Sequence, residues 1–270
     1  MTAAIVDRLG RLGRFLWAGW TGLAGMSLLA ALWQAGHEAY GDFILPAPLA
    51  TLEAAFGLLR EPANWRIALT TTLRALQGFV LAGAIGTVAG LAAGYSPATM
   101  RLARPLLTIL LGVPPIAWIV LAMIWFGSTD GTITTTVVIA SLPLVFVGAA
   151  EGAATRDRSL DDMARAFGAS PLFRLTSIGL RHVSAHLFPA LAIALGSAFK
   201  VAVMAELLAN TGGIGGALAS ARANLDIAAA LGWVLLAVAA LIVFEYGVLY
   251  PIRAEFERWR EAARPWGVKR

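Results

Sequence analysis

Long apolar runs alternate with short polar stretches along most of the chain. Each of six runs is close to the roughly 20 residues that a helix needs to cross the hydrocarbon core of a bilayer. They cover residues 15–35, 67–95, 105–126, 133–150, 187–209 and 227–250. The pattern therefore predicts an all-α polytopic membrane protein with six transmembrane helices.

One polar stretch, Leu160–Arg174, interrupts the apolar pattern in the C-terminal two thirds of the chain. Within it Met163, Ala166 and Phe167 follow the i, i+3, i+4 spacing of an amphipathic helix, and Gly168 ends that helix. A short helix with an exposed apolar ridge suits docking into a groove on a soluble partner. An ordinary polar loop between two membrane helices is the alternative.

Proline and glycine mark where the helical pattern breaks or packs closely. Pro114 and Pro115 interrupt the third apolar run, either as a structural kink or as a kink beside a pathway. In the second run, Gly86, Gly90 and Gly94 recur every four residues, a spacing that lets two helix backbones approach closely. We also expect a short amphipathic helix at 49–59, a turn at 96–104 and an external loop at 210–226.

The charge distribution predicts the topology. The chain is 59% hydrophobic and 14% charged, with a formal net charge of +5. With six spans, sixteen Lys and Arg residues fall on the side of both termini and three on the other side, while Arg74 and Lys200 lie inside spans. Because Lys and Arg accumulate in cytoplasmic loops, we expect both termini in the cytoplasm. The chain then consists of a basic arm (1–14), a membrane domain (15–250) with a cytoplasmic loop at 152–186, and an amphipathic tail (251–270).

The residue types do not point to an enzyme. The chain has no cysteine, which excludes disulfides and thiolate metal sites, and no catalytic or metal-ligand cluster is apparent. Ionisable residues inside the spans are few, so the energy for any transport is expected to come through the cytoplasmic loop. We expect the Arg74 guanidinium to reach the lipid headgroups rather than to form a buried ion pair.

Four segments carry a family resemblance. They are Phe43–Pro48, Val113–Trp118 with Ile124–Gly127, Ala205-Glu206 with Gly212–Gly215, and the cytoplasmic stretch Asp162-Met-Ala164, Gly168, Ile178 and Leu180. The last resembles the motif Glu-Ala-Ala, three residues, Gly, nine residues, Ile, one residue, Leu-Pro, with Asp for Glu, Met for the first Ala and Arg181 for Pro. With these segments the chain resembles the permease subunit of a bacterial ABC importer of the binding-protein-dependent type, in its nitrate/sulfonate/taurine-like branch.

The resemblance implies partners and roles. Two permease copies form a homodimer in the bacterial inner membrane with the pathway between them. Two cytoplasmic ATPase subunits carry the ATP and Mg²⁺, and a soluble binding protein delivers the solute from outside. The chain itself is expected to be a non-catalytic subunit without a cofactor or metal. Coupling to the ATPase is expected at Asp162, Ala164, Arg165, Phe167 and Gly168.

Five residues are candidates for the translocation pathway: Pro114, Pro115, Trp118, Lys200 and Glu206. Lys200 indicates an anionic solute such as a sulfonate or nitrate, although it could instead be the partner of Glu206. The two are six positions apart and do not share one helix face, so their pairing would need a bend or another chain.

Two other functions remain open. A self-sufficient secondary transporter or channel would work without an ATPase, but the sequence shows neither an inverted repeat nor the buried acidic residues that such carriers use. A membrane scaffold would bind a cytoplasmic partner without moving a solute, and its adjacent prolines would be a simple kink.

Overall fold

The computed structural model describes residues 2–156, 158–252 and 254, and the regular elements in this part of the chain are helices. In chain order they are α1 (Thr2–Tyr40), α2 (Pro48–Arg60), α3 (Pro62–Tyr95), α4 (Pro97–Gly112), α5 (Pro115–Phe126), α6 (Asp130–Ala154), α7 (Arg158–Ala166), α8 (Pro171–Arg174), η1 (Leu175–Gly179), α9 (Leu180–Ala209), α10 (Ile214–Ala223), α11 (Ile227–Phe244) and η2 (Glu245–Leu249), where η marks a π-helical turn. The predicted all-α class is confirmed.

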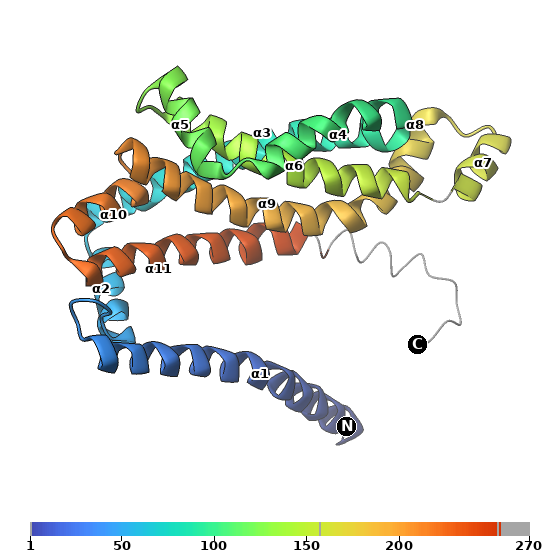
Figure 1. Ribbon diagram of the computed structural model, residues 1–270. Coiled ribbons are helices and arrows are strands. Elements are labelled where there is room, and N and C mark those ends of the chain that lie inside the picture. Colours follow the sequence, from blue (N-terminus) through green and yellow to red (C-terminus); the bar gives the residue numbers. More distant parts are fainter. Residues whose placement is uncertain (1, 157, 253, 255–270) are drawn as a thin grey trace.

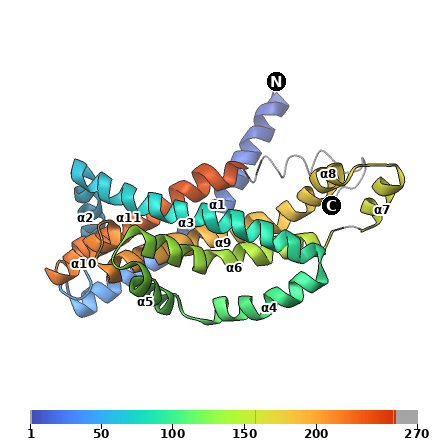
Figure 2. The same ribbon diagram turned by 90° about the horizontal axis from the view of Figure 1, so that it is seen from above.

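Four long helices, α3, α6, α9 and α11, lie side by side and form the body of the molecule (Figure 1). α6 packs against both α3 and α9. α7 and α8 extend from one end of this body, and α2 and α10 lie at the opposite end (Figure 2). Two segments that are far apart in the sequence, α7 and α10, therefore mark the two ends of the same bundle.

Four helical segments are long and apolar enough to cross a membrane: Pro62–Tyr95, Asp130–Ala154, His182–Ala209 and Ile227–Ile252. They contain the predicted spans at 67–95, 133–150, 187–209 and 227–250. α4 and α5 together form a fifth candidate, bent by 95°. The predicted first span, 15–35, lies in α1, where side chains are described only at Trp20 and from Gly22 on, so the count of six stays a prediction. The tail at 251–270 lies almost wholly outside the described residues.

The third predicted span differs from its expected form. We expected a turn at 96–104, and this was wrong: α4 begins at Pro97, and the Ser96 hydroxyl accepts a hydrogen bond of 3.3 Å from the Thr99 N–H. Proline is well tolerated at the first position of a helix and serine is a favoured N-cap, so the helix starts there despite its polar residues. α4 then ends at Gly112, and the 95° bend falls at the two prolines.

Glycines bring α3 and α6 into close contact along much of their length. Gly78, Gly86, Gly90 and Gly94 all face α6. A Cβ atom added at Gly86 would lie only 2.9 Å from the Leu142 carbonyl oxygen. The predicted close packing at the four-residue glycine spacing is thus confirmed, with α6 as the partner helix.

A second glycine contact joins α6 to α9. A Cβ at Gly152 would lie 2.7 Å from the Cα of Val183, and one at Gly148 would lie 3.0 Å from the His186 carbonyl oxygen. α6 is therefore held between α3 and α9 without room for larger side chains. A core that includes the fully buried Ile119, Ile133, Val137, Ala198 and Ala202 fills the space between these helices and α5.

Candidate functional site

The C-terminal end of α7 is a tight left-handed turn. Gly168 has a φ of +76°, its N–H donates to the Arg165 carbonyl at 3.0 Å, and the Ala169 N–H donates to the Ala164 carbonyl at 2.9 Å. This pair of bonds is the Schellman motif, in which a glycine ends the helix and its last carbonyls are satisfied. The predicted role of Gly168 as the end of the helix is confirmed.

One face of α7 presents apolar side chains to the outside. Phe167 is 85% exposed and Met163 is 52% exposed, and Leu160, one turn earlier, is exposed as well. We call Leu160, Met163 and Phe167 the docking ridge. Burying a large aromatic side chain releases about 1.5–3 kcal/mol, so a ridge of this kind favours association with an apolar groove.

The other coupling candidates surround this ridge. Asp162 and Arg165 are exposed, and Ala164 is half-buried. The structure therefore brings all five predicted coupling residues onto α7 and the turn that ends it. Their contact with an ATPase remains a proposal.

One contact joins α7 to α8, and another joins the ends of α6 and α3 next to the start of α7. Arg174 of α8 donates to the Asp161 carboxylate of α7 at 3.3 Å. The guanidinium of Arg156, just after α6, lies 4.3 Å from the centroid of the Tyr95 ring at the end of α3. In chain order α7 follows α6 and leads through α8 and η1 into α9, so it connects two of the long helices.

The left-handed turn at Gly168 gives a first test. Gly168→Val is expected to weaken ATPase binding about tenfold, because an L-residue in this conformation costs roughly 1–2 kcal/mol and the turn would open. Gly168→Asn should retain most of the binding, since asparagine adopts this conformation more readily. The affinity of purified ATPase for permease in detergent measures both. Equal binding by the two variants would contradict the role of the turn.

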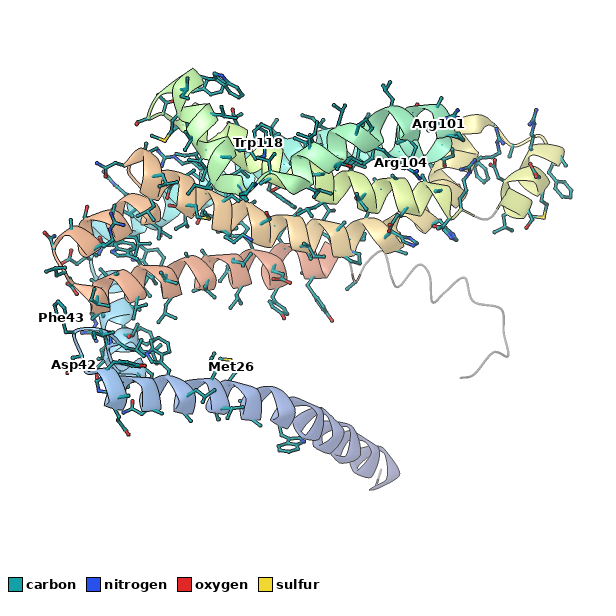
Figure 3. All side chains as sticks on the ribbon, in the orientation of Figure 1. Met26, Asp42, Phe43, Arg101, Arg104 and Trp118 are labelled. Carbon is teal, nitrogen blue, oxygen red and sulfur yellow. The ribbon has the colours of Figure 1, made fainter. Side chains whose placement is uncertain are left out.

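The proposed pathway residues lie in separate places. Pro114 is exposed at the bend, Pro115 begins α5, and Trp118, labelled in Figure 3, lies one turn further along. The Trp118 Nε1 is buried and has no hydrogen-bond partner in the described part of the chain. A buried indole N–H usually has an acceptor, so this donor is left unsatisfied in the described part of the single chain.

Lys200 borders a cavity of about 280 Å³ between α9 and α11. The other lining residues are apolar: Gly196, Phe199, Val203, Met204, Val234, Ala237, Val238 and Leu241. Lys200 is exposed, whereas Glu206 on the same helix is fully buried, so the two do not form a pair.

Glu206 instead pairs with Arg74. The Arg74 Nη1 donates to the Glu206 carboxylate at 2.8 Å, and its Nη2 contacts the Asp130 carboxylate. The Arg74 side chain is only 13% exposed, so our expectation that it reaches the headgroups was wrong. The buried carboxylate explains the difference, because a charge at this depth is stabilised far more by an opposite charge than by a distant headgroup.

Sequence reasoning missed this polar cluster. Arg74 and Glu206 are 132 positions apart, and their spacing along the chain gives no indication of contact. The available signal was the presence of two opposite charges inside predicted spans, since such residues usually pair with one another.

Comparison with known proteins agrees with these features. The family model described as the binding-protein-dependent transport system inner membrane component matches residues 67–249. The chain is 28% identical over 220 residues to a probable ABC transporter permease protein of Brucella melitensis, covering 82% of this chain and 86% of the relative.

Two further relatives carry more specific names. The chain is 25% identical over 207 residues to the putative aliphatic sulfonates transport permease protein SsuC of Bacillus subtilis, with 76% and 75% of the two chains covered. It is 26% identical over 198 residues to the nitrate import permease protein NrtB of Leptolyngbya laminosa, with 70% and 69% covered. Since the family match covers more than half of the chain and lies on its membrane-spanning helices, the chain belongs to the binding-protein-dependent transport inner membrane components, as an ABC importer permease of the nitrate, sulfonate and taurine branch.

Proposed function

We propose that this permease forms the pathway of an ATP-driven importer for a small anionic solute delivered by a binding protein. The observation that carries the proposal is the exposed docking ridge on α7, which is connected at both ends to the long helices. An ATPase that binds this ridge and changes conformation when it binds ATP would move α6 and α9 together. ATP and Mg²⁺ belong to that partner, and this chain supplies no cofactor or catalytic group.

The quaternary arrangement we propose has two permease copies and two ATPase subunits. α1 contacts the rest of the chain chiefly through α2 and exposes Leu23, Met26, Leu29 and Leu32 (Figures 1 and 3). Lipid and a second copy can both cover such a surface. In a homodimer the two Lys200 cavities would open toward a shared pathway.

The orientation we propose places α7 in the cytoplasm. Arg101 and Arg104 lie on α4 near the end of the bundle that carries α7 and α8, and Asp42 and Phe43 lie at the opposite end (Figure 3). An excess of arginine at one end favours the cytoplasm for that end. The N- and C-terminal segments then also lie inside, and α10 lies outside.

An anionic solute is supported by the charge beside the cavity and by the names of two relatives. The only charged residue among those lining the Lys200 cavity is Lys200 itself. The sulfonate and nitrate permeases are named for anions. Pro114, Pro115 and Trp118 are proposed to line the pathway as well. Glu206 is left out because its side chain has no exposed surface in the single chain.

Co-purification and reconstitution test this function together. The tagged chain, isolated from its own membranes in mild detergent, should bring down an ATPase, and vesicles containing both should take up an anion only with ATP and a binding protein. Uptake driven by an ion gradient with the chain alone would establish the secondary transporter instead. ATPase binding without any solute movement would favour the scaffold.

Substitution of Lys200 tests whether its charge contributes to uptake of the anionic solute. Lys200→Ala should lower anion uptake about tenfold or more, because a charged hydrogen bond contributes about 1.5–3 kcal/mol. Lys200→Arg keeps the charge and should retain most of the uptake. Initial uptake rates at low solute concentration in vesicles measure the effect. Unchanged or faster anion uptake by Lys200→Ala would remove Lys200 from the pathway.

A further inference from the structure

The Glu206 carboxylate is the centre of a buried polar cluster at the end of the bundle opposite α7. It is 0% exposed and accepts hydrogen bonds from the Thr71 hydroxyl at 2.7 Å, the Arg74 guanidinium at 2.8 Å and the Gly215 N–H at 3.0 Å. The Thr71 hydroxyl in turn accepts a bond of 2.7 Å from the Ile214 N–H. Side chains of α3 and α9 thereby bind the first two backbone N–H groups of α10.

α10 depends on this arrangement because its own sequence supplies no cap. The residue before it is Gly213, which has no side chain to accept a hydrogen bond. A helix of ten residues is also too short to be stable in isolation. α10 is therefore held in place by residues of other helices rather than by its local sequence.

The glycines around α10 fit the cluster closely. A Cβ atom at Gly213 would lie 2.5 Å from the Glu206 carboxyl carbon, and one at Gly215 would lie 2.5 Å from the Glu206 Cβ. The glycine-rich segment 211–216 thus packs onto Glu206 and brings the Gly215 N–H to its carboxylate.

Arg74 extends the cluster to two further segments. Its Nη1 also donates to the Gly212 carbonyl, and its Nη2 donates to Asp130 at the start of α6. One guanidinium therefore connects α3 with α6, with α9 and with the segment that leads into α10. Closer to α7, the glycine contacts described above join the same three long helices, α3, α6 and α9.

We propose that Glu206 and Arg74 are positioning residues that hold α10 on α3 and α9, so that the end of the pathway opposite α7 moves together with these helices. The inference rests on the proposed function, since it concerns how movement started at α7 reaches the far end. Without the cluster, α3, α6 and α9 could still move, but α10 would not follow them. ATP would then be hydrolysed with less solute transported.

Because the chain has no cysteine, single cysteines can report on α10 in the complete transporter. Ala221 of α10 is buried and Ser220 beside it is exposed. In the parent, Ala221→Cys should react slowly with a membrane-impermeant maleimide and Ser220→Cys rapidly. Adding Glu206→Gln, which keeps the shape but removes the charge, should speed labelling at 221 at least tenfold and leave 220 unchanged.

The same variant tests coupling. In vesicles with the ATPase and binding protein, Glu206→Gln should raise the number of ATP molecules hydrolysed per solute imported at least threefold. Thr71→Val removes two hydrogen bonds but keeps the ion pair, and should change both readouts in the same direction to a smaller extent. Thr71→Val takes the place of Glu206→Gln as the test variant if Glu206→Gln does not reach the membrane. Asp130→Asn is the matched control, because Asp130 is 73% exposed and its loss leaves the Arg74–Glu206 pair intact.

Unchanged labelling at 221 in both Glu206→Gln and Thr71→Val would overturn the proposal, as would faster labelling with an unchanged ratio of ATP to solute. If the parent shows no ATP-driven uptake, the proposed function fails on its own. The labelling result would still decide whether the cluster holds α10.

Discussion

Phe167→Ala is expected to reduce ATPase binding at least about 30-fold and to abolish ATP-driven uptake, while leaving the permease itself folded. Phe167 is 85% exposed, so its side chain contributes little to packing within the chain. At protein interfaces a buried aromatic anchor commonly accounts for 2 kcal/mol or more, which corresponds to this change in affinity. The dissociation constant for purified ATPase and the thermal unfolding midpoint of the permease measure the two effects separately.

Phe43→Ala is the matched control for this variant. Phe43 is also an exposed phenylalanine, but it lies at the end of the molecule opposite α7 (Figure 3). It should leave ATPase affinity unchanged. If both variants bind the ATPase as the parent does, the docking ridge is not the ATPase contact, and the polar-loop interpretation of the 160–174 stretch would be the better one.

Gly90→Val is expected to destabilise the permease by about 3 kcal/mol or more, because it overfills the contact between α3 and α6. A Cβ at Gly90 would meet the Phe146 carbonyl oxygen and lie 2.8 Å from the Cβ of Ala149. A backbone carbonyl and a short alanine side chain cannot rotate away, so the helices would have to separate. The fraction of folded protein during denaturation in detergent measures the loss.

Gly83→Val provides the control on the same helix. The nearest atom to a Cβ at Gly83 is the Leu191 Cδ2 at 3.8 Å, an ordinary contact. Both variants add the same side chain to α3 and change its helix propensity alike. Equal stability of the two would mean that the α3–α6 contact is looser than the structure indicates.

Much of the fold could be predicted because it depends on local pattern. Apolar runs gave the spans that α3, α6, α9 and α11 confirm, and the i, i+3, i+4 spacing with Gly168 gave α7 and its end. The residues proposed to couple to an ATPase could likewise be placed on one short helix and the turn that ends it. The errors were at 96–104 and 210–226, which contain the start of α4 and all of α10. At 96–104 the polar residues suggested a turn, but the Ser96 side chain caps a helix there. At 210–226 the glycines suggested a loop, but side chains of α3 and α9 cap α10.

By itself, the sequence determined the membrane class, most of the helices and the exposed ridge of α7, since hydrophobic periodicity and glycine or proline breaks act within a few residues. Only the tertiary structure decided that Arg74 pairs with Glu206, that α6 is the helix facing the glycines of α3, and that the two prolines turn the chain by 95°. These depend on which helices meet and at what depth. A buried charge needs an opposite charge beside it, and a buried glycine needs a helix that fits closely against it. The residues next to either one in the sequence do not identify that partner.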